Sequence, residues 1–153
     1  MLTRVALAAW LSALPQVTDA HGWPFHRPAG FADVIATVTL EHPEVDARVL
    51  AATLDVVAAH ESSYRLHPRG YNDGGASKGA WQTPAAETPD DALGQARVAA
   101  KWLLYSMTRC PDYPLAIYAT GHVCGPVKVA DYYWSQVRAE LAQSPLPAPD
   151  SQP

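Results

Sequence analysis

Residues 44–62 read EVDARVLAATLDVVAAHES, and this stretch predicts the central helix of the protein. Pro43 precedes it and suits the first turn of a helix, and the acidic residues that follow suit the positive end of the helix dipole. Apolar residues recur along the stretch at helical spacing, at Leu50, Leu54 and Val57. Glu61 is the next position on that stripe, so we expect a carboxyl group where an apolar helix face ends.

Other helices are expected on both sides of this central one, at residues 31–41, 88–108, 114–120 and from Pro126 onward. Thr88 is followed by Pro-Asp-Asp and is expected to cap the second of these helices. Residues 65–80 contain four glycines, and a short hairpin is expected around residues 72–75, where Asp-Gly favours a tight turn. The prediction is a mainly α single domain with a Gly-rich loop or short hairpin beside the central helix.

The domain is assigned to residues 21–143, and the two ends of the chain lie outside it. Residues 1–20 carry one arginine before an apolar run, a pattern that fits either a signal peptide or a first helix packed on the domain. Residues 144–153 contain four prolines and no core-forming residues, so a disordered tail is expected there. No stretch approaches the roughly 20 apolar residues that a membrane span needs.

Composition and charge exclude some classes of function. The net charge is −4, and the 11 Lys and Arg residues are scattered along the chain. A nucleic-acid-binding protein usually has a basic patch, so no nucleic-acid partner is expected. Cys110 and Cys124 flank one short segment, and the sequence fits equally a disulfide that closes this loop and two buried free thiols.

Glu61 has a chemical use if its surroundings are apolar. Cleavage of a glycosidic bond needs a proton donor at the leaving oxygen, and a carboxylic acid serves near neutral pH when burial raises its pKa. The apolar stripe of the central helix supplies such surroundings. The plain alternative is a solvated glutamate at a frayed helix end.

Three ordered blocks resemble the lysozyme-like fold of lytic transglycosylases of the SLT type and of goose-type lysozymes. Glu61-Ser62 resembles the Glu-Ser at the end of the catalytic helix of those families. Residues 77–82 (SKGAWQ) resemble their Ser-x-Gly-Leu-Met-Gln, and residues 116–121 (AIYATG) resemble a Tyr-Asn-Ala-Gly segment. The resemblance covers roughly residues 31–140 and departs from the pattern at Ala80-Trp81 and at Ala119, where asparagine is usual.

The resemblance implies a peptidoglycan-cleaving enzyme. Glu61 would protonate the oxygen that links N-acetylmuramic acid to N-acetylglucosamine, and Ser62 would steady the end of the glutamate helix or touch the sugar. Gln82 would begin the wall opposite Glu61 and bind an N-acetyl group or backbone. Tyr118 would direct its hydroxyl toward Glu61. The matched residues Ser77 and Gly79 are expected to contact the substrate with them.

The role of Asp73 bears on whether the product has a hydrolysed end or a 1,6-anhydro end. Goose-type lysozymes have an aspartate in this region that is thought to place a water, so Asp73 is a candidate second catalytic residue, with help from Asn72. The other interpretation is that Asn-Asp-Gly-Gly only forms a turn and has no part in the reaction. Without a second acid, the sugar's own 6-hydroxyl attacks and leaves a 1,6-anhydro end, as in lytic transglycosylases. The sequence leaves hydrolysis and anhydro-forming transfer open.

Parts of the sequence relate to two other classes of function. His60-Glu61 begins like a zinc-peptidase motif, but Tyr64 stands where the second histidine is required, so neither a metal nor another cofactor is expected. The second class is a non-catalytic module that binds peptidoglycan or serves as a structural part of a phage particle or secretion assembly. Either way the partner is a peptidoglycan strand, and the expected location is the cell envelope, the periplasm or the outside of the cell.

Overall fold

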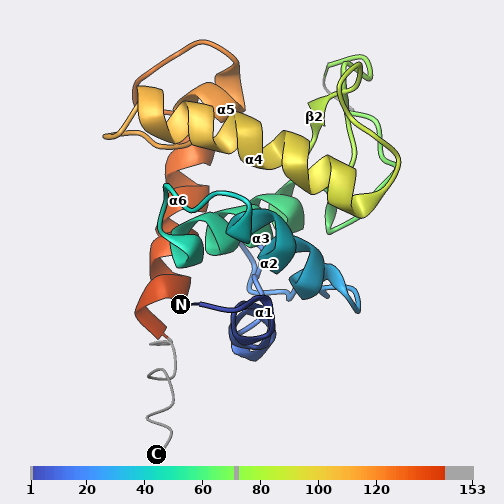
Figure 1. Ribbon diagram of the computed structural model, residues 1–153. Helices are drawn as coiled ribbons and strands as arrows, with labels where there is room; N and C mark the ends of the chain where they lie inside the picture. The colour runs from blue at the N-terminus through green and yellow to red at the C-terminus, as the bar shows by residue number, and fades with distance from the viewer. Residues whose placement is uncertain (1, 71–72, 144–153) are drawn as a thin grey trace, which may run out of the picture.

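The computed structural model describes residues 2–70 and 73–143 (Figure 1). Six helices and a pair of two-residue strands are present in this part of the chain, and the prediction of a mainly α fold is confirmed. The helices are α1 (Arg4–Ala13), α2 (Phe31–Leu40), α3 (Ala47–Ser62), α4 (Ala92–Arg109), α5 (Ala116–Thr120) and α6 (Lys128–Gln143). The strands are β1 (Ser77–Lys78) and β2 (Thr83–Pro84), which pair antiparallel.

Helix α3 is the predicted central helix, but it begins three residues later than expected. Asp46 is its N-cap and accepts a hydrogen bond from the backbone N of Arg48 at 2.9 Å, so the acid caps the helix instead of lying within its first turn. The helix ends sharply, because Ser63 and Tyr64 both have positive φ angles, of 55° and 62°. This abrupt end leaves Glu61 in the last turn of the helix.

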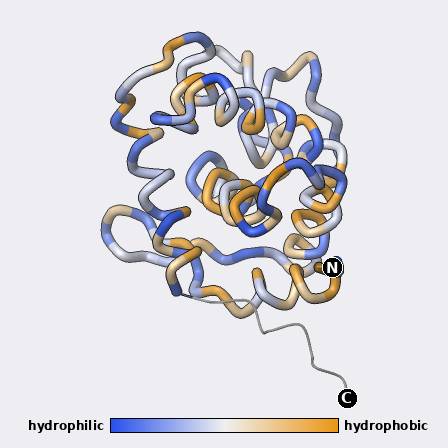
Figure 2. The backbone as a smooth tube through the Cα atoms, turned by 60° about the vertical axis from the view of Figure 1, so that its left-hand side comes forward, coloured by the Kyte–Doolittle hydropathy of each residue, from blue (hydrophilic) through white to orange (hydrophobic). Residues whose placement is uncertain are grey.

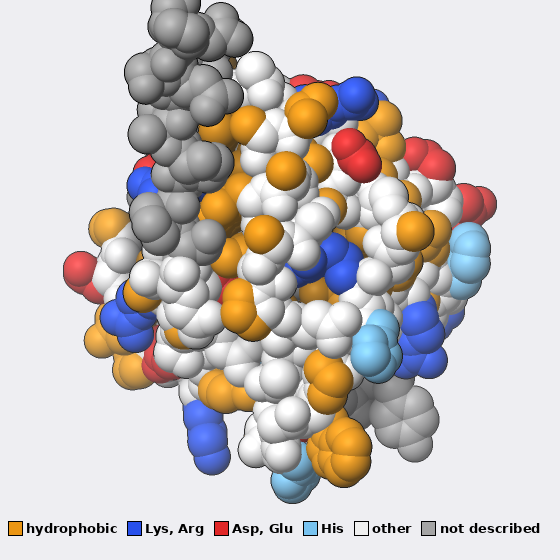
Figure 3. Space-filling view, turned by 90° about the horizontal axis from the view of Figure 1, so that it is seen from below, with side chains coloured by type: hydrophobic (Ala, Val, Ile, Leu, Met, Phe, Trp, Pro, Cys, Tyr) orange, Lys and Arg blue, Asp and Glu red, His pale blue; other side chains and the backbone are white. Residues whose placement is uncertain are grey.

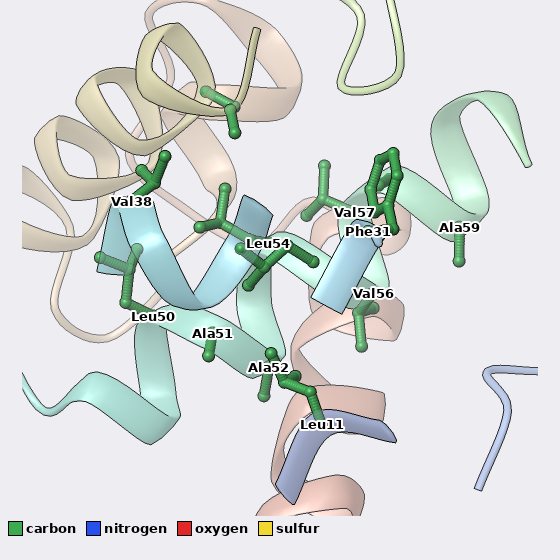
Figure 4. Close-up of a cluster of buried hydrophobic side chains, with 14 of the residues drawn as sticks. Leu11, Phe31, Val38, Leu50, Ala51, Ala52, Leu54, Val56, Val57 and Ala59 are labelled. Atoms are coloured by element: carbon green, nitrogen blue, oxygen red, sulfur yellow. The ribbon is translucent and has the colours of Figure 1, made fainter. Parts of the chain in front are cut away.

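The core is built around α3. Helices α2, α4 and α6 pack on it, and α1 packs on α2 and α3 (Figure 1). Figure 4 shows Leu11, Phe31 and Leu54, from three different helices, in one apolar cluster. Hydrophobic and hydrophilic residues alternate along the helices in Figure 2, as expected for amphipathic helices that share a core.

Helix α1 is joined to the domain by both apolar and polar contacts. Leu7, Trp10 and Leu11 are buried. The Arg27 guanidinium donates from Nη1 to the carbonyl oxygen of Leu11 at 2.7 Å and from Nε to Asp55 Oδ1 at 2.7 Å, so it connects α1 with α3. The face of the molecule seen from below mixes apolar, basic and acidic side chains, and no large area of one charge is visible on its described part (Figure 3).

The chain on either side of the expected turn at residues 72–75 pairs antiparallel, because Gly70 N donates to the carbonyl oxygen of Ser77 at 2.9 Å and Arg69 forms a bridge with Lys78; Asn72 lies outside the described residues. A second hairpin turn, which the sequence did not predict, follows at residues 79–82 between β1 and β2, and the expected start of the next helix is wrong. Helix α4 is capped by Asp91, which accepts from the backbone N of Gly94 at 2.7 Å. The expected cap, Thr88, donates its hydroxyl to the carbonyl oxygen of Pro84 instead, at 2.7 Å, and so belongs to the end of the hairpin.

The C-terminal half is closed by a disulfide between Cys110 and Cys124, which decides between the two states that the sequence left open. The bond ties the end of α4 to the segment between α5 and α6. Gly121 ends α5 in the left-handed conformation, with φ of 83°, as a glycine after a short helix does. The expected tail at 144–153 lies outside the described residues. No helix in the described part of the chain has the length and apolarity to cross a membrane.

Candidate active site

Glu61 lies on the wall of an open cleft of about 510 Å³ between the end of α3, the Gly-rich loop and α5. The cleft is lined by Glu61, Gly70, Asp73, Ser77, Gln82, Tyr118 and Ala119. A second, more apolar hollow of about 330 Å³ continues from it, because both share Asp73, Ser77, Gln82 and Tyr118. Trp102 and Ile117 line the far part of this second hollow. The two together form a groove, which fits an extended ligand better than a compact one.

The carboxyl group of Glu61 is in surroundings that favour its protonated form. Burial at the end of α3 raises the pKa of Glu61, and a hydrogen bond from Tyr133 lowers it in part. The apolar stripe of α3 that leads to Glu61 is fully buried at Leu50, Leu54 and Val57, so the helix enters the cleft directly from the core. A proton donor for a basic leaving group needs this combination of a raised pKa and an open cleft.

Tyr133 on α6 contacts Glu61 and was not among the residues expected from sequence. Burial raises the pKa of the Tyr133 phenol well above its usual value, and the neighbouring Glu61 contributes to the increase. The ring of Tyr133 stacks on that of His60, with centroids 4.8 Å apart. His60 is held in turn by Gln136, because His60 Nε2 and Gln136 Oε1 are 2.8 Å apart. A sequence signal exists, since Tyr133 lies one turn before the buried Val137 on α6.

Tyr118 lines the cleft, but its hydroxyl is not directed at Glu61 as expected. It donates a hydrogen bond to the backbone carbonyl of Trp81. Burial, followed by the charge of Glu61, raises the pKa of the Tyr118 phenol well above its usual value, so the two groups are close enough to interact electrostatically. Tyr118 therefore joins α5 to the hairpin turn, and Tyr133 performs the contact with Glu61 that was expected of Tyr118.

Gln82 and Ser77 form the wall opposite α5. Gln82 has a φ of 48°, and its Nε2 donates to the carbonyl oxygens of Gly79 and Pro68, at 2.9 and 3.2 Å. Ser77 Oγ lies 3.2 Å from Gln82 Oε1 and also contacts Asp73. The side-chain amide of Gln82 thus fixes its own backbone turn, and Gln82 lines the cleft beside Ser77.

Gly79 and Ser62 reach the cleft only through the residues they position. A Cβ atom on Gly79 would lie 2.4 Å from Gln95 Oε1, so glycine lets the turn approach that amide, which accepts from the backbone N of Ala80 at 2.9 Å. Ser62 is buried, and its hydroxyl donates to the carbonyl oxygen of Ala80 at 2.9 Å. Of the two roles expected for Ser62, the structure is compatible with steadying the helix end, because a buried hydroxyl cannot touch a sugar.

Asp73 lines the cleft, but its carboxylate is engaged in its own loop. Oδ1 accepts hydrogen bonds from the backbone N of Gly75 and of Ala76, at 3.0 and 3.1 Å. Oδ2 accepts from the backbone N and from the hydroxyl of Ser77. The Ser77 hydroxyl and these backbone donors lower the pKa of Asp73, so it is ionised near neutral pH. The four bonds are those of a turn-forming aspartate.

No family profile, curated protein or solved structure matches the chain. Within the described residues there is also no group of three or more His, Cys, Asp or Glu side chains placed to hold a metal ion. The chemistry that the cleft can support rests on one partly buried acid, Glu61, beside an open groove with polar walls.

Proposed function

We propose that the protein is a muramidase-type enzyme that cleaves the β-1,4 bond between N-acetylmuramic acid and N-acetylglucosamine in peptidoglycan, with Glu61 as general acid. One observation carries the proposal: burial raises the pKa of a glutamate that lines an open groove. The ordered blocks around Glu61, Gln82 and Tyr118 add the resemblance to lysozyme-like enzymes, and these three residues line the same cleft.

The form of the groove supports a polymeric substrate. Polar groups surround Glu61, and the continuing hollow offers the apolar side chains of Trp102, Ile117 and Pro84. Sugar rings present hydroxyl groups at their edges and C–H groups on their faces, so a cleft with both kinds of wall suits a glycan. In this interpretation Gln82 Oε1 and Ser77 accept or donate hydrogen bonds at the sugar edge.

The hydrogen bonds that hold Asp73 in its own loop favour lytic transfer over hydrolysis. Glu61 and Asp73 are the two acidic residues among the described residues that line the groove, and all four bonds to Asp73 come from its own loop. Glu61 would protonate the glycosidic oxygen as the bond from C1 breaks. The 6-hydroxyl of the muramic acid would then attack C1 and return its proton to the Glu61 carboxylate. This sequence needs a single carboxyl group and yields a 1,6-anhydro end.

The same proposal places the protein in the envelope or outside the cell. The disulfide between Cys110 and Cys124 is of the kind that persists in oxidising compartments, where peptidoglycan is also found. One observation favours the alternative of a non-catalytic peptidoglycan-binding or structural module of a phage particle or secretion assembly. Ala119 lines the cleft where the resembling families have asparagine, so the cleft lacks one polar contact.

A turbidity assay on purified peptidoglycan separates the two. Wild type is expected to clear the suspension, and Glu61→Gln to lose about a hundredfold or more of the rate, because the amide cannot donate the proton. Glu44→Gln is the matched control, since Glu44 is an exposed glutamate near the other end of α3. Equal clearing by wild type and Glu61→Gln, or no clearing by either, would overturn the proposal.

The products decide the reaction type. Mass spectrometry of the soluble fragments is expected to show ends lighter by one water than those of a hydrolysed strand, as a 1,6-anhydro sugar is. Fragments with reducing ends alone would show that water is the acceptor. Asp73 would then be the first candidate for the group that orients this water, because it is the other acid of the cleft.

A further inference from the structure

The segment that leaves the catalytic helix presents three basic side chains on one side. Arg65, His67 and Arg69 are exposed, and the residues between them, Leu66 and Pro68, are partly buried. This alternation is that of a chain whose successive side chains point in opposite directions. We name Arg65, His67 and Arg69 the basic ridge.

The backbone of the basic ridge is held from its inner side. Gln95 on α4 donates from Nε2 to the carbonyl oxygen of Leu66 at 2.8 Å, and Gln82 donates from Nε2 to that of Pro68 at 3.2 Å. The backbone of Arg69 also forms a β-bridge with Lys78 of β1. Buried amide groups thus fix the segment at alternate residues. The basic side chains are presented on an ordered support rather than on a free loop.

The two arginines of the basic ridge have no carboxylate partner within 4 Å among the described residues, whereas Arg27, Arg48 and Arg97 each form an ion pair. Arg65 donates from Nε to the carbonyl oxygen of Ser62 at 2.8 Å and Arg69 from Nη1 to that of Gly75 at 3.4 Å, and the other donors of these two guanidinium groups have no partner among the described residues. Asp90 is an acidic neighbour of the ridge, but it is paired with Lys78. The hydrogen bond from Lys78 is the main cause of the lowered pKa of Asp90, and the charges of His67 and Arg69 lower that pKa less. The ridge therefore has unused positive charge.

The basic ridge continues the cleft that contains Glu61. A hollow of about 430 Å³ is lined by residues 65–68, and another of about 500 Å³ by Arg69, Gly70, Gly74 and Gly75. Gly70 also lines the Glu61 cleft. Gly70 thus joins the Glu61 cleft to the hollow at Arg69, and a substituent on a sugar bound at Glu61 would approach the ridge from this side.

We propose that the basic ridge is a binding site for carboxylate groups on the peptide stems that muramic acid carries. The proposal rests on the proposed function, because the stem must leave a sugar held beside Glu61. Guanidinium groups pair with carboxylates through two parallel N–H bonds, which suits them to this ligand. The ridge would thereby select strands that still bear their stems over strands that have lost them.

Binding to insoluble peptidoglycan, measured in a Glu61→Gln background so that the material is not consumed, tests the site. The ridge variant is Arg65→Gln with Arg69→Gln. The control is Arg4→Gln with Arg138→Gln, which removes the same charge from two exposed arginines of α1 and α6. On stem-bearing peptidoglycan freed of phosphate polymers, the ridge variant is expected to bind about five- to tenfold more weakly than the control, at low salt.

Two further binding measurements identify the ligand. On strands stripped of their stems by an amidase, the ridge variant and the control should bind equally, and a persisting difference overturns the proposal. The proposal is also overturned if the two variants differ in binding only when phosphate polymers are left on the peptidoglycan. Equal binding of the two variants to the stem-bearing material also overturns it.

Lysine variants guard against a local folding defect. Arg65→Lys with Arg69→Lys keeps both charges but loses the paired N–H donors, so its binding should lie between that of the background protein and that of the glutamine pair. A loss as large as that of the glutamine pair would trace the effect to the Arg65 bond with Ser62 and overturn the charge-based site. Failure here leaves the clearing assay unaffected, so it is distinguishable from failure of the proposed function.

Discussion

Tyr133 of α6 interacts with the carboxyl group of Glu61 at the end of α3 and lowers its pKa, and His60, the residue before Glu61, stacks on the same tyrosine ring. Helices α3 and α6, which are 65 residues apart in the sequence, are thus joined at the proposed catalytic acid. Since Tyr133 is itself held by the stack on His60, the orientation of Glu61 depends on how α6 packs against α3. This packing is one of the most extensive between elements of the domain.

Replacing Tyr133 by phenylalanine should change both the rate and its pH dependence. The Tyr133 hydrogen bond lowers the pKa of Glu61, so its loss raises that pKa further. A general acid works only while protonated, so the falling side of the pH–rate profile should move to higher pH. The maximal rate should drop about tenfold, the equivalent of one hydrogen bond to a charged group, about 1.5 kcal/mol.

Tyr105→Phe is the control for that experiment, because Tyr105 is exposed on α4. Its pH–rate profile should coincide with that of wild type. A Tyr133→Phe profile that moves to lower pH, or that does not move while the rate falls, would contradict the assigned contact with Glu61.

Asp73→Asn should slow clearing without changing the product. The amide can accept fewer of the four hydrogen bonds that Asp73 receives in its loop, so the wall that carries Ser77 should loosen. We expect a rate reduced by about three- to tenfold, from the loss of roughly 1 kcal/mol of loop bonding. The measurement is the ratio of anhydro to reducing ends by mass spectrometry. A ratio that shifts with the substitution would give Asp73 a part in the chemistry.

The helices and the position of Glu61 at the end of the stripe on α3 follow from apolar spacing. The loop hydrogen bonds of Asp73 are those of the turn that Asn-Asp-Gly-Gly predicts. These features depend on neighbours within a few residues, which a sequence displays directly. Ser77, Gln82 and Tyr118, which line the cleft with Glu61, follow instead from the resemblance of the ordered blocks to lysozyme-like enzymes.

The features that the sequence did not predict depend on distance in space. Tyr132 and Tyr133 are adjacent tyrosines, and only the packing of α6 on α3 decides that Tyr133 is the one beside Glu61. The cap of α4 was assigned to Thr88 instead of Asp91 because both residues can cap, and the choice depends on Thr88 being drawn to Pro84 of the hairpin. Competition between two adequate local partners is settled by the tertiary fold.

The buried ion pair of Arg27 and Asp55 should contribute far more to stability than the exposed pair of Arg97 and Glu41. Asp55 is fully buried and Arg27 is 10% exposed, so Arg27→Met leaves an uncompensated charge and severs the bond to Leu11 of α1. The expected loss in the free energy of unfolding is about 3–5 kcal/mol. Arg97→Met, the matched control at a half-exposed pair, should cost about 0–1 kcal/mol. Thermal or denaturant unfolding measures both, and equal losses would contradict the assigned connection between α1 and α3.

Glu140 makes stability depend on pH in a direction opposite to that of most carboxylates. Both carboxyl oxygens are buried with no hydrogen-bond partner among the described residues. Burial, reinforced by the charge of Asp55 and opposed by Arg27, raises the pKa of Glu140 from 4.5 to about 8. Between these values the folded chain holds a proton that the unfolded chain has lost, so the free energy of unfolding should fall as pH rises from 4.5 to 8.

Glu140→Gln removes this dependence, because the amide has nearly the shape of the protonated acid and does not ionise. At pH 5 the variant and wild type should unfold at similar temperatures. At pH 8 the variant should be more stable by roughly 2 kcal/mol or more, since each pKa unit of difference corresponds to about 1.4 kcal/mol. Glu44→Gln, at an exposed position, should show no such gain. Melting curves of Glu140→Gln and wild type that stay parallel from pH 5 to 8 would mean that Glu140 is ionised in the fold, and the carboxylate would then need a cationic partner in that part of α6.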